Sequence, residues 1–207
     1  MHRSGTSLVA KVLEKSGIFM GVVKDHNYEA MHFLSLNQQT LWAAGANWIT
    51  PKVPDQIFWK SMPADVLFYE HYRTYGRWKQ FLLKAKTPAW GWKDPRNTFT
   101  LPMWLKRYPN ARIIHVTRNV DDVAASLAKR NLVAGEVHDP RFDDLDFGRS
   151  LARAYIEQGR SYQAELENRY IEISYEDLVA LKPETIQRLE NFTAKTLLPL
   201  FKHYVIK

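Results

Sequence analysis

The pattern of apolar and polar residues predicts a chain in which helices alternate with a few short strands. The clearest strand is residues 112–117, Arg-Ile-Ile-His-Val-Thr, which is rich in β-branched side chains. A similar run predicts a strand at 169–174, and a shorter apolar run predicts a buried strand at 89–92. Helical spacing of apolar residues predicts helices at 8–16, 29–44, 65–85, 97–107, 121–128, 145–168 and 183–192, with a helical turn at 176–181.

Two predicted helices have residues at their first positions that favour the start of a helix. Asn97 or Thr98 is expected to cap the helix that follows strand 89–92. Asp121 or Asp122 is expected to start the helix after strand 112–117. Residues 131–147 are highly charged, so we predict a loop there.

Alternating strands and helices predict an α/β fold with a parallel sheet that is covered by helices on both faces. Ligands of such sheets bind at the carboxyl ends of the strands. Lys93, Arg118 and Tyr175 each follow the end of a predicted strand, and Arg3 would follow one as well. We therefore expect these side chains to share one site for an anionic ligand.

Composition and charge narrow the class of protein. The 207 residues are 45% apolar, enough for one α/β domain with a substantial core, and contain no cysteine, which excludes disulfides and zinc–cysteine sites. Lysine and arginine outnumber acidic residues by 29 to 22, which suits an anionic ligand. The basic residues are dispersed, so nucleic-acid binding is not expected. Without a membrane-length apolar run or a signal peptide, a cytoplasmic protein is expected.

The first seven residues, Met-His-Arg-Ser-Gly-Thr-Ser, combine a cation, hydroxyls and a flexible turn directly before a helix. Gly5 lets a ligand approach the backbone, while Arg3, Ser4, Thr6 and Ser7 supply donors. Such a loop at a helix start can hold a phosphate or sulfate. Ser and Thr also cap ordinary helices, so this segment alone leaves both interpretations open. It is not a Walker A loop, because it lacks the lysine of that motif.

A second segment places an arginine at a strand end and a hydroxyl on the next helix. Arg118 precedes Ser126 by eight positions, in the run Arg-Asn-Val-Asp-Asp-Val-Ala-Ala-Ser. Two such groups can hold a phosphate from two sides. Either residue alone would be an ordinary surface arginine or helix serine.

Together these segments resemble the sulfotransferases that use PAPS (3′-phosphoadenosine 5′-phosphosulfate). Residues 2–7 resemble the family's 5′-phosphosulfate loop, and residues 118–126 resemble its 3′-phosphate motif R-[ND]-P-x-D-V-x-x-S, with Val120 where proline is usual. Tyr175 begins a Tyr-Glu-Asp-Leu segment similar to one in which the family's tyrosine lies near the adenine. Leu8 stands where the cytosolic branch has an adenine-stacking tryptophan, so adenine packing is expected to differ.

Two further segments resemble a bacterial branch of this family. Residues 29–37 resemble its E-x-x-x-x-x-x-L-N segment, and residues 91–96 resemble its K-D-P-R loop. The resemblance implies that Glu29 takes the acceptor's proton, with His26 and His32 as the next candidates. The other interpretation of Glu29 is a first-turn helix glutamate that the helix dipole favours.

The K-D-P-R loop supplies two cations and a carboxylate. Lys93 and Arg96 are expected to hold the donor or an acidic acceptor, and Asp94 is expected to orient them by ion pairing. The resemblance gives Lys93 a catalytic role beside Glu29 and Arg3.

The resemblance covers Arg3 to Phe192 and implies a three-layer, P-loop-like parallel sheet in a single domain over 1–207, with acceptor-side helices at about 25–86. It implies in-line transfer of a sulfuryl group from PAPS to a hydroxyl or amine, without a metal and with PAP as the product. The acceptor and the oligomeric state are not specified. Alternatives are a P-loop-like nucleotide kinase and a non-catalytic nucleotide-binding protein. The residues expected to bind PAPS are Arg3, Ser4, Gly5, Thr6, Ser7, Arg118, Ser126 and Tyr175.

In a P-loop-like fold, the loop that binds phosphate directly follows the end of a central parallel strand. Here the loop begins at residue 2, inside the family pattern G-M-H-R-S-G-T-S. We therefore expect the chain to lack that first central strand and to be truncated at its start.

Overall fold

The structure is a computed structural model that describes residues 1–21, 23–55, 89–133 and 138–206. The helix predicted at 65–85 lies outside the described residues. The chain forms two compact units. The first comprises Met1–Thr6 and Leu105–Lys207, and the second comprises Ser7–Trp104.

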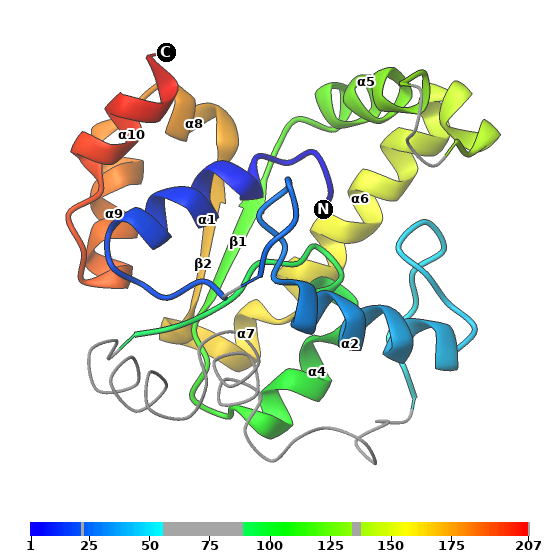
Figure 1. The fold of residues 1–207 in the computed structure, drawn as a ribbon, viewed down its shortest axis with the longest axis horizontal. Helices are drawn as coiled ribbons and strands as arrows, with labels where there is room; N and C mark the ends of the chain where they lie inside the picture. The colour runs from blue at the N-terminus through cyan, green and yellow to red at the C-terminus, as the bar shows by residue number, and fades with distance from the viewer. Residues whose placement is uncertain (22, 56–88, 134–137, 207) are drawn as a thin grey trace. The chain divides into compact units, whose positions relative to one another are not determined.

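A parallel pair of strands lies at the centre of the first unit. Strand β1 (Ile113–Thr117) pairs with β2 (Tyr170–Ser174), with Ile113 opposite Tyr170 and Thr117 opposite Ser174. Figure 1 shows the two strands side by side, β1 in green and β2 in orange. Both predicted strands and their parallel direction are confirmed. The described sheet has these two strands, and the three-layer arrangement stays a prediction.

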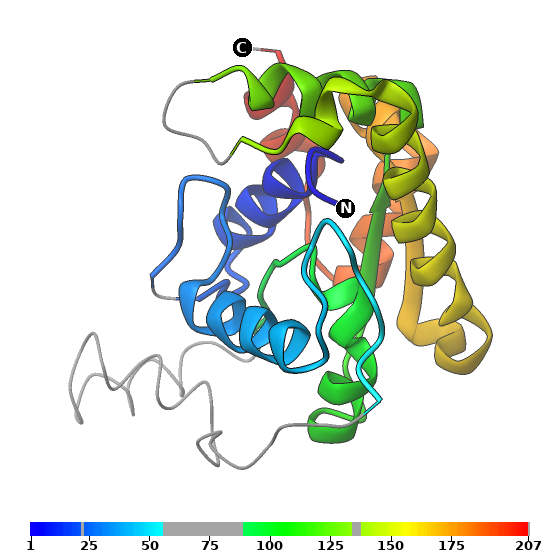
Figure 2. The same cartoon turned by 90° about the vertical axis from the view of Figure 1, so that its right-hand side faces the viewer.

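Helices form the crossover between these strands, as parallel pairing requires. They are α5 (Val120–Asn131) and α6 (Leu145–Ser161), which pack against each other, followed by the short α7 (Gln163–Leu166) (Figure 2). The predicted loop at 131–147 is only partly correct, because it contains a 3₁₀ turn at Pro140–Asp143 and the start of α6.

Helix α5 begins one or two residues before the predicted start at Asp121 or Asp122. Asn119 is the N-cap, and its side-chain oxygen accepts hydrogen bonds from the backbone N–H groups of Asp121 (2.8 Å) and Asp122 (3.4 Å). The aspartates therefore lie in the first turn, where negative charge is favoured, rather than capping the helix.

Three helices follow β2: α8 (Tyr175–Val179), α9 (Pro183–Thr193) and α10 (Leu198–Val205). The last was not predicted from the sequence. It buries Phe201, and the residue before it, Leu197, is fully buried as well. No helix among the described residues is long and apolar enough to cross a membrane.

The second unit contains α2 (Met31–Ala43) and most of α1 (Thr6–Lys15) and α4 (Asn97–Arg107), close to the predicted bounds. The strand predicted at 89–92 is reduced to a single parallel bridge between Phe19 and Trp90. Phe19 lies between Gly17 and Gly21, which both have positive φ. The segment that pairs with Trp90 is therefore extended only briefly.

Aromatic rings form the core of this unit. Phe33 stacks on Trp92 with ring centroids 4.1 Å apart, and Trp104 contacts Trp92 edge-on at 4.8 Å. Since Phe33 lies on α2 and Trp104 on α4, this cluster joins the two helices around the K-D-P-R loop.

Candidate functional site

The loop at the start of the chain has an unusual backbone. Arg3 and Gly5 both adopt left-handed conformations, with φ of 64° and 82°. For a residue with a Cβ atom, such as Arg3, this costs roughly 1–2 kcal/mol. Strain of this kind is concentrated at functional sites. The buried hydroxyl of Ser4 donates to the carbonyl of Met1 over 2.7 Å and closes the turn.

Tyr175 packs directly against this loop. A Cβ atom on Gly5 would overlap the ring of Tyr175, far inside van der Waals contact. Only glycine therefore allows both the positive φ and the close approach of the ring. The Arg118 guanidinium lies over the same ring, 4.9 Å from its centroid. Tyr175 thus supports the loop, and its contact with adenine stays a prediction.

Most of the residues predicted to bind phosphate lie in the first unit, and Ser7 lies in the second. Nε of Arg3 donates to Oγ of Ser126 over 2.8 Å, and Nη1 of Arg118 donates to the carbonyl of Arg3 over 3.1 Å. Asp122 lies 3.7 Å from Arg118 but is well exposed, so it offsets little of the positive charge. Nε of Arg118 is buried and has no hydrogen-bond partner among the described residues.

Glu176 connects the two strand ends and was not recognised as important from the sequence. Its Oε1 accepts from the backbone N–H of Asn119 at 2.8 Å, and its Oε2 accepts from the hydroxyl of Ser174 at 2.7 Å. Burial opposes ionisation, but these hydrogen bonds and the charge of Arg118 outweigh it and lower the pKa of Glu176. The ionised carboxylate holds the Arg118–Asn119 turn against the start of α8.

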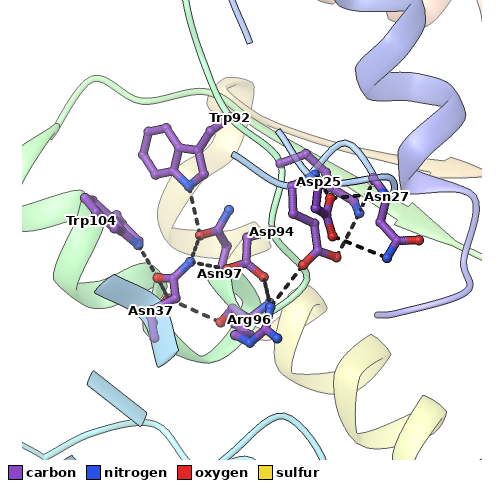
Figure 3. Close-up of polar contacts among 11 residues, drawn as sticks. Asp25, Asn27, Asn37, Trp92, Asp94, Arg96, Asn97 and Trp104 are labelled. Carbon is purple, nitrogen blue, oxygen red and sulfur yellow. Dashed lines mark hydrogen bonds and ion pairs between the residues drawn. The ribbon is translucent and has the colours of Figure 1, made fainter. Parts of the chain in front are cut away.

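In the second unit, Glu29 lies at the centre of a buried group of charges. Its Oε1 accepts from Nζ of Lys93 at 3.0 Å, and its Oε2 accepts from Nη1 of Arg96 at 3.1 Å. The same Nη1 donates to Oδ1 of Asp94 at 2.9 Å (Figure 3). Glu29 is only 3% exposed and precedes α2, which begins at Met31, so it is not a first-turn glutamate.

The proton affinity of Glu29 reflects opposing influences. Burial is the largest influence and raises its pKa, the negative charge of Asp94 acts in the same direction, and Lys93 and Arg96 act against both. The net result is a raised pKa. Because two cations remain within hydrogen-bonding distance, the carboxylate can ionise despite its burial.

A turn at Asp25 presents Glu29 just before α2. Oδ1 of Asp25 accepts from the backbone N–H groups of Asn27 (2.9 Å) and Glu29 (2.7 Å). The carbonyl of Asn27 then accepts from both Ser7 Oγ (2.7 Å) and Lys93 Nζ (2.9 Å). Ser7, the last residue of the predicted phosphosulfate loop, thus belongs to the same hydrogen-bonded group as Lys93. An Asx turn before a helix was the available sequence signal.

The two histidines considered as bases lie elsewhere on this segment. His26 is exposed, with Nε2 3.0 Å from the amide nitrogen of Asn27. His32 lies on α2 with its ring edge-on to Phe33, at 5.7 Å between centroids.

The predicted site residues therefore fall into two groups. The first unit contains Arg3, Ser4, Gly5, Thr6, Arg118, Ser126 and Tyr175, and the second contains Ser7, Glu29 and Lys93. The described residues include no group of three or more histidine, aspartate or glutamate side chains that could hold a metal ion.

Comparison with known proteins gives one result that bears on this arrangement. No curated protein and no solved structure matches the chain. A family model described as the sulfotransferase family matches residues 1–195, which include every predicted site residue. The chain belongs to the sulfotransferase family.

Proposed function

We propose that this protein transfers a sulfuryl group from PAPS to a hydroxyl or amine acceptor. Membership of the sulfotransferase family supports sulfuryl transfer in general. The observation that carries the PAPS assignment is the contact of Arg3 with Ser126 and Arg118, because it joins residues from two phosphate-binding motifs.

The residues present fit an anionic nucleotide. The buried Nε of Arg118 is a donor without a partner among the described residues, and Arg3 is an exposed cation beside it. Guanidinium groups and hydroxyls are the usual partners of phosphate oxygens. Gly5 lets the loop adopt its positive φ with the Tyr175 ring packed against it.

The predicted site residues of the first unit have separate roles in this proposal. Arg118 and Ser126 bind the 3′-phosphate, while the backbone N–H groups of the loop and the Thr6 hydroxyl bind the 5′-phosphosulfate. The hydroxyls of Ser4 and Ser7 already donate to the carbonyls of Met1 and Asn27. When bound, PAPS supplies the sulfuryl group and leaves as PAP. Arg3 neutralises the negative charge that develops on the bridging oxygen.

Glu29 is the general base of the proposed reaction. Its raised pKa brings it closer to the range in which a carboxylate works well as a base near neutral pH. It takes the acceptor's proton while Lys93 and Arg96 hold its two oxygens. A three-layer P-loop-like fold, a single domain over 1–207 and a cytoplasmic location are parts of the same proposal.

Titration with PAP and with ATP plus magnesium tests the donor, and labelled PAPS with a library of acceptors tests the reaction. We expect PAP to bind more tightly than ATP–magnesium, and label to transfer to a subset of acceptors. Preference for ATP–magnesium would favour a nucleotide kinase. PAP binding without transfer to any acceptor would favour a non-catalytic nucleotide-binding protein.

A further inference from the structure

Asn37 lies on α2 with 0% of its surface exposed, and its amide is fully hydrogen-bonded. Its Oδ1 accepts from Thr100 Oγ1 at 2.6 Å and from Trp104 Nε1 at 2.7 Å. Its Nδ2 donates to Asp94 Oδ2 at 2.9 Å and to Asn97 Oδ1 at 2.7 Å (Figure 3). An amide has two donors and an oxygen with two lone pairs, so no hydrogen-bonding capacity is left over.

The hydrogen bonds continue from Asn37 to the proposed base. Asp94, whose Oδ2 is held by Asn37, uses Oδ1 to accept from the backbone N–H of Arg96 at 3.0 Å and from its Nη1 at 2.9 Å. The same Nη1 donates to Glu29 Oε2 at 3.1 Å. One guanidinium nitrogen is therefore shared between two carboxylates.

This sharing depends on Asp94 having another donor. The Asp94 side chain is completely buried, and a buried carboxylate that loses a hydrogen bond is strongly destabilised. Without the Asn37 amide, Asp94 would draw the Arg96 guanidinium towards itself and away from Glu29. Lys93 would remain on Glu29, and Asp25 would still accept from its backbone N–H.

We propose that Asn37 is a positioning residue for Glu29: by holding Asp94, it fixes the Arg96 guanidinium where it contacts both carboxylates. This inference rests on the proposed function, in which Glu29 accepts the acceptor's proton. Asn37 touches neither substrate nor the reacting atoms and acts through two other side chains.

The first test measures the pKa of Glu29 directly, by NMR titration of protein with ¹³C-labelled glutamate carboxyls, assigned with Glu29→Gln. Asn37→Leu should raise the pKa of Glu29 by about half a unit to one unit, because less of the Arg96 charge reaches it. Asp94→Asn should lower it, because a nearby negative charge is removed. Opposite shifts from these two variants are a specific signature of the proposed chain of contacts.

Thr100→Val is the matched control, because it removes a hydrogen bond to Oδ1 of the same asparagine and leaves Nδ2 on Asp94. It should lower stability but leave the pKa of Glu29 at its wild-type value. Equal shifts in Thr100→Val and Asn37→Leu, or no shift in Asn37→Leu, would overturn the proposal. If Asn37→Leu does not fold, Asn37→Ala provides the same test, because it removes both donors with a smaller side chain and adds no charge.

The pH dependence of PAPS turnover separates this inference from the proposed function. We expect the acid limb of kcat/KM to move with the pKa of Glu29 in each variant. A Glu29 pKa that shifts in a protein unable to transfer sulfuryl groups would refute the function and leave the positioning role standing. Turnover with an unmoved acid limb would refute the positioning role.

Discussion

Nε of Arg3 donates a hydrogen bond to Oγ of Ser126 across 123 positions of sequence. The two residues come from different segments, each recognised separately as a candidate phosphate site. Their contact means that one guanidinium can reach groups expected to bind opposite ends of PAPS. The predictions for the donor site follow from this contact and from the nearby Arg118.

Arg118→Ala should weaken the binding of PAP more than that of adenosine 5′-phosphosulfate, which lacks the 3′-phosphate. Loss of a charge-assisted hydrogen bond costs about 1.5–3 kcal/mol, or roughly one to two decades in Kd. Isothermal titration calorimetry would measure both ligands. Arg149→Ala is the control, because it removes an equal charge from an ion pair with Asp121 on the same unit. Equal losses for the two ligands would contradict the assignment.

Glu29→Gln should leave PAP affinity nearly unchanged and lower turnover by about 10²–10⁴-fold, the usual contribution of a general base. Steady-state assays with an identified acceptor would measure the effect. The control is Glu14→Gln, which changes a glutamate paired with Lys24. If Glu29→Gln kept full turnover, the base would have to be sought at His26 or His32.

Gly5→Ala should destabilise the protein more than Gly17→Ala. Both glycines have positive φ, but a Cβ at Gly17 meets nothing within 4 Å, whereas one at Gly5 overlaps the Tyr175 ring. Gly17→Ala should therefore cost only the backbone strain, roughly 1–2 kcal/mol. Urea denaturation gives both free energies of unfolding. Similar losses at the two positions would show that the Tyr175 contact is unimportant.

Acid should destabilise the first unit through His115. Burial lowers the pKa of His115 from 6.5 to about 4, with further effects from the chain's amino terminus and the Glu172–Arg160 pair. Because the pKa of His115 is lower in the folded protein, the unfolded chain binds the proton at a higher pH. Neutral His115 therefore makes its full contribution to stability above pH 6.5. This contribution is lost as pH falls from 6.5 towards 4, by up to about 3 kcal/mol.

Unfolding by urea at a series of pH values would measure this loss. His115→Gln should flatten the stability profile between pH 6.5 and 4, whereas His203→Gln, at an exposed histidine, should not. A wild-type profile that is already flat across this range would contradict the prediction.

The sequence predicted the local structure well where short-range chemistry determines it. Strand β1 is β-branched at every position except His115, and its bounds differ from the prediction by one residue. Helix α10 was missed because it is short, although its Pro199 is a common first-turn residue. The start of α5 was predicted at an aspartate, whereas Asn119 caps the helix and Val120 begins it.

The site was predicted as a set of residues but not as a set of contacts. Family motifs identified Glu29, Lys93 and Arg96, but spacing along the chain gives no information about which oxygen faces which cation. The central place of Asn37 could not be predicted, because its partners lie 57 to 67 positions away. Such contacts depend on how α2 and α4 pack.

The buried charges around Glu29 have a consequence for the effect of ionic strength. Glu29 and Asp94 balance Lys93 and Arg96, and mobile ions screen buried pairs far less than exposed ones. Arg3, by contrast, is an exposed cation. Added salt should therefore weaken donor binding while hardly changing the pH at which the base ionises. The two halves of the proposed reaction would then respond separately to the medium in which the protein works.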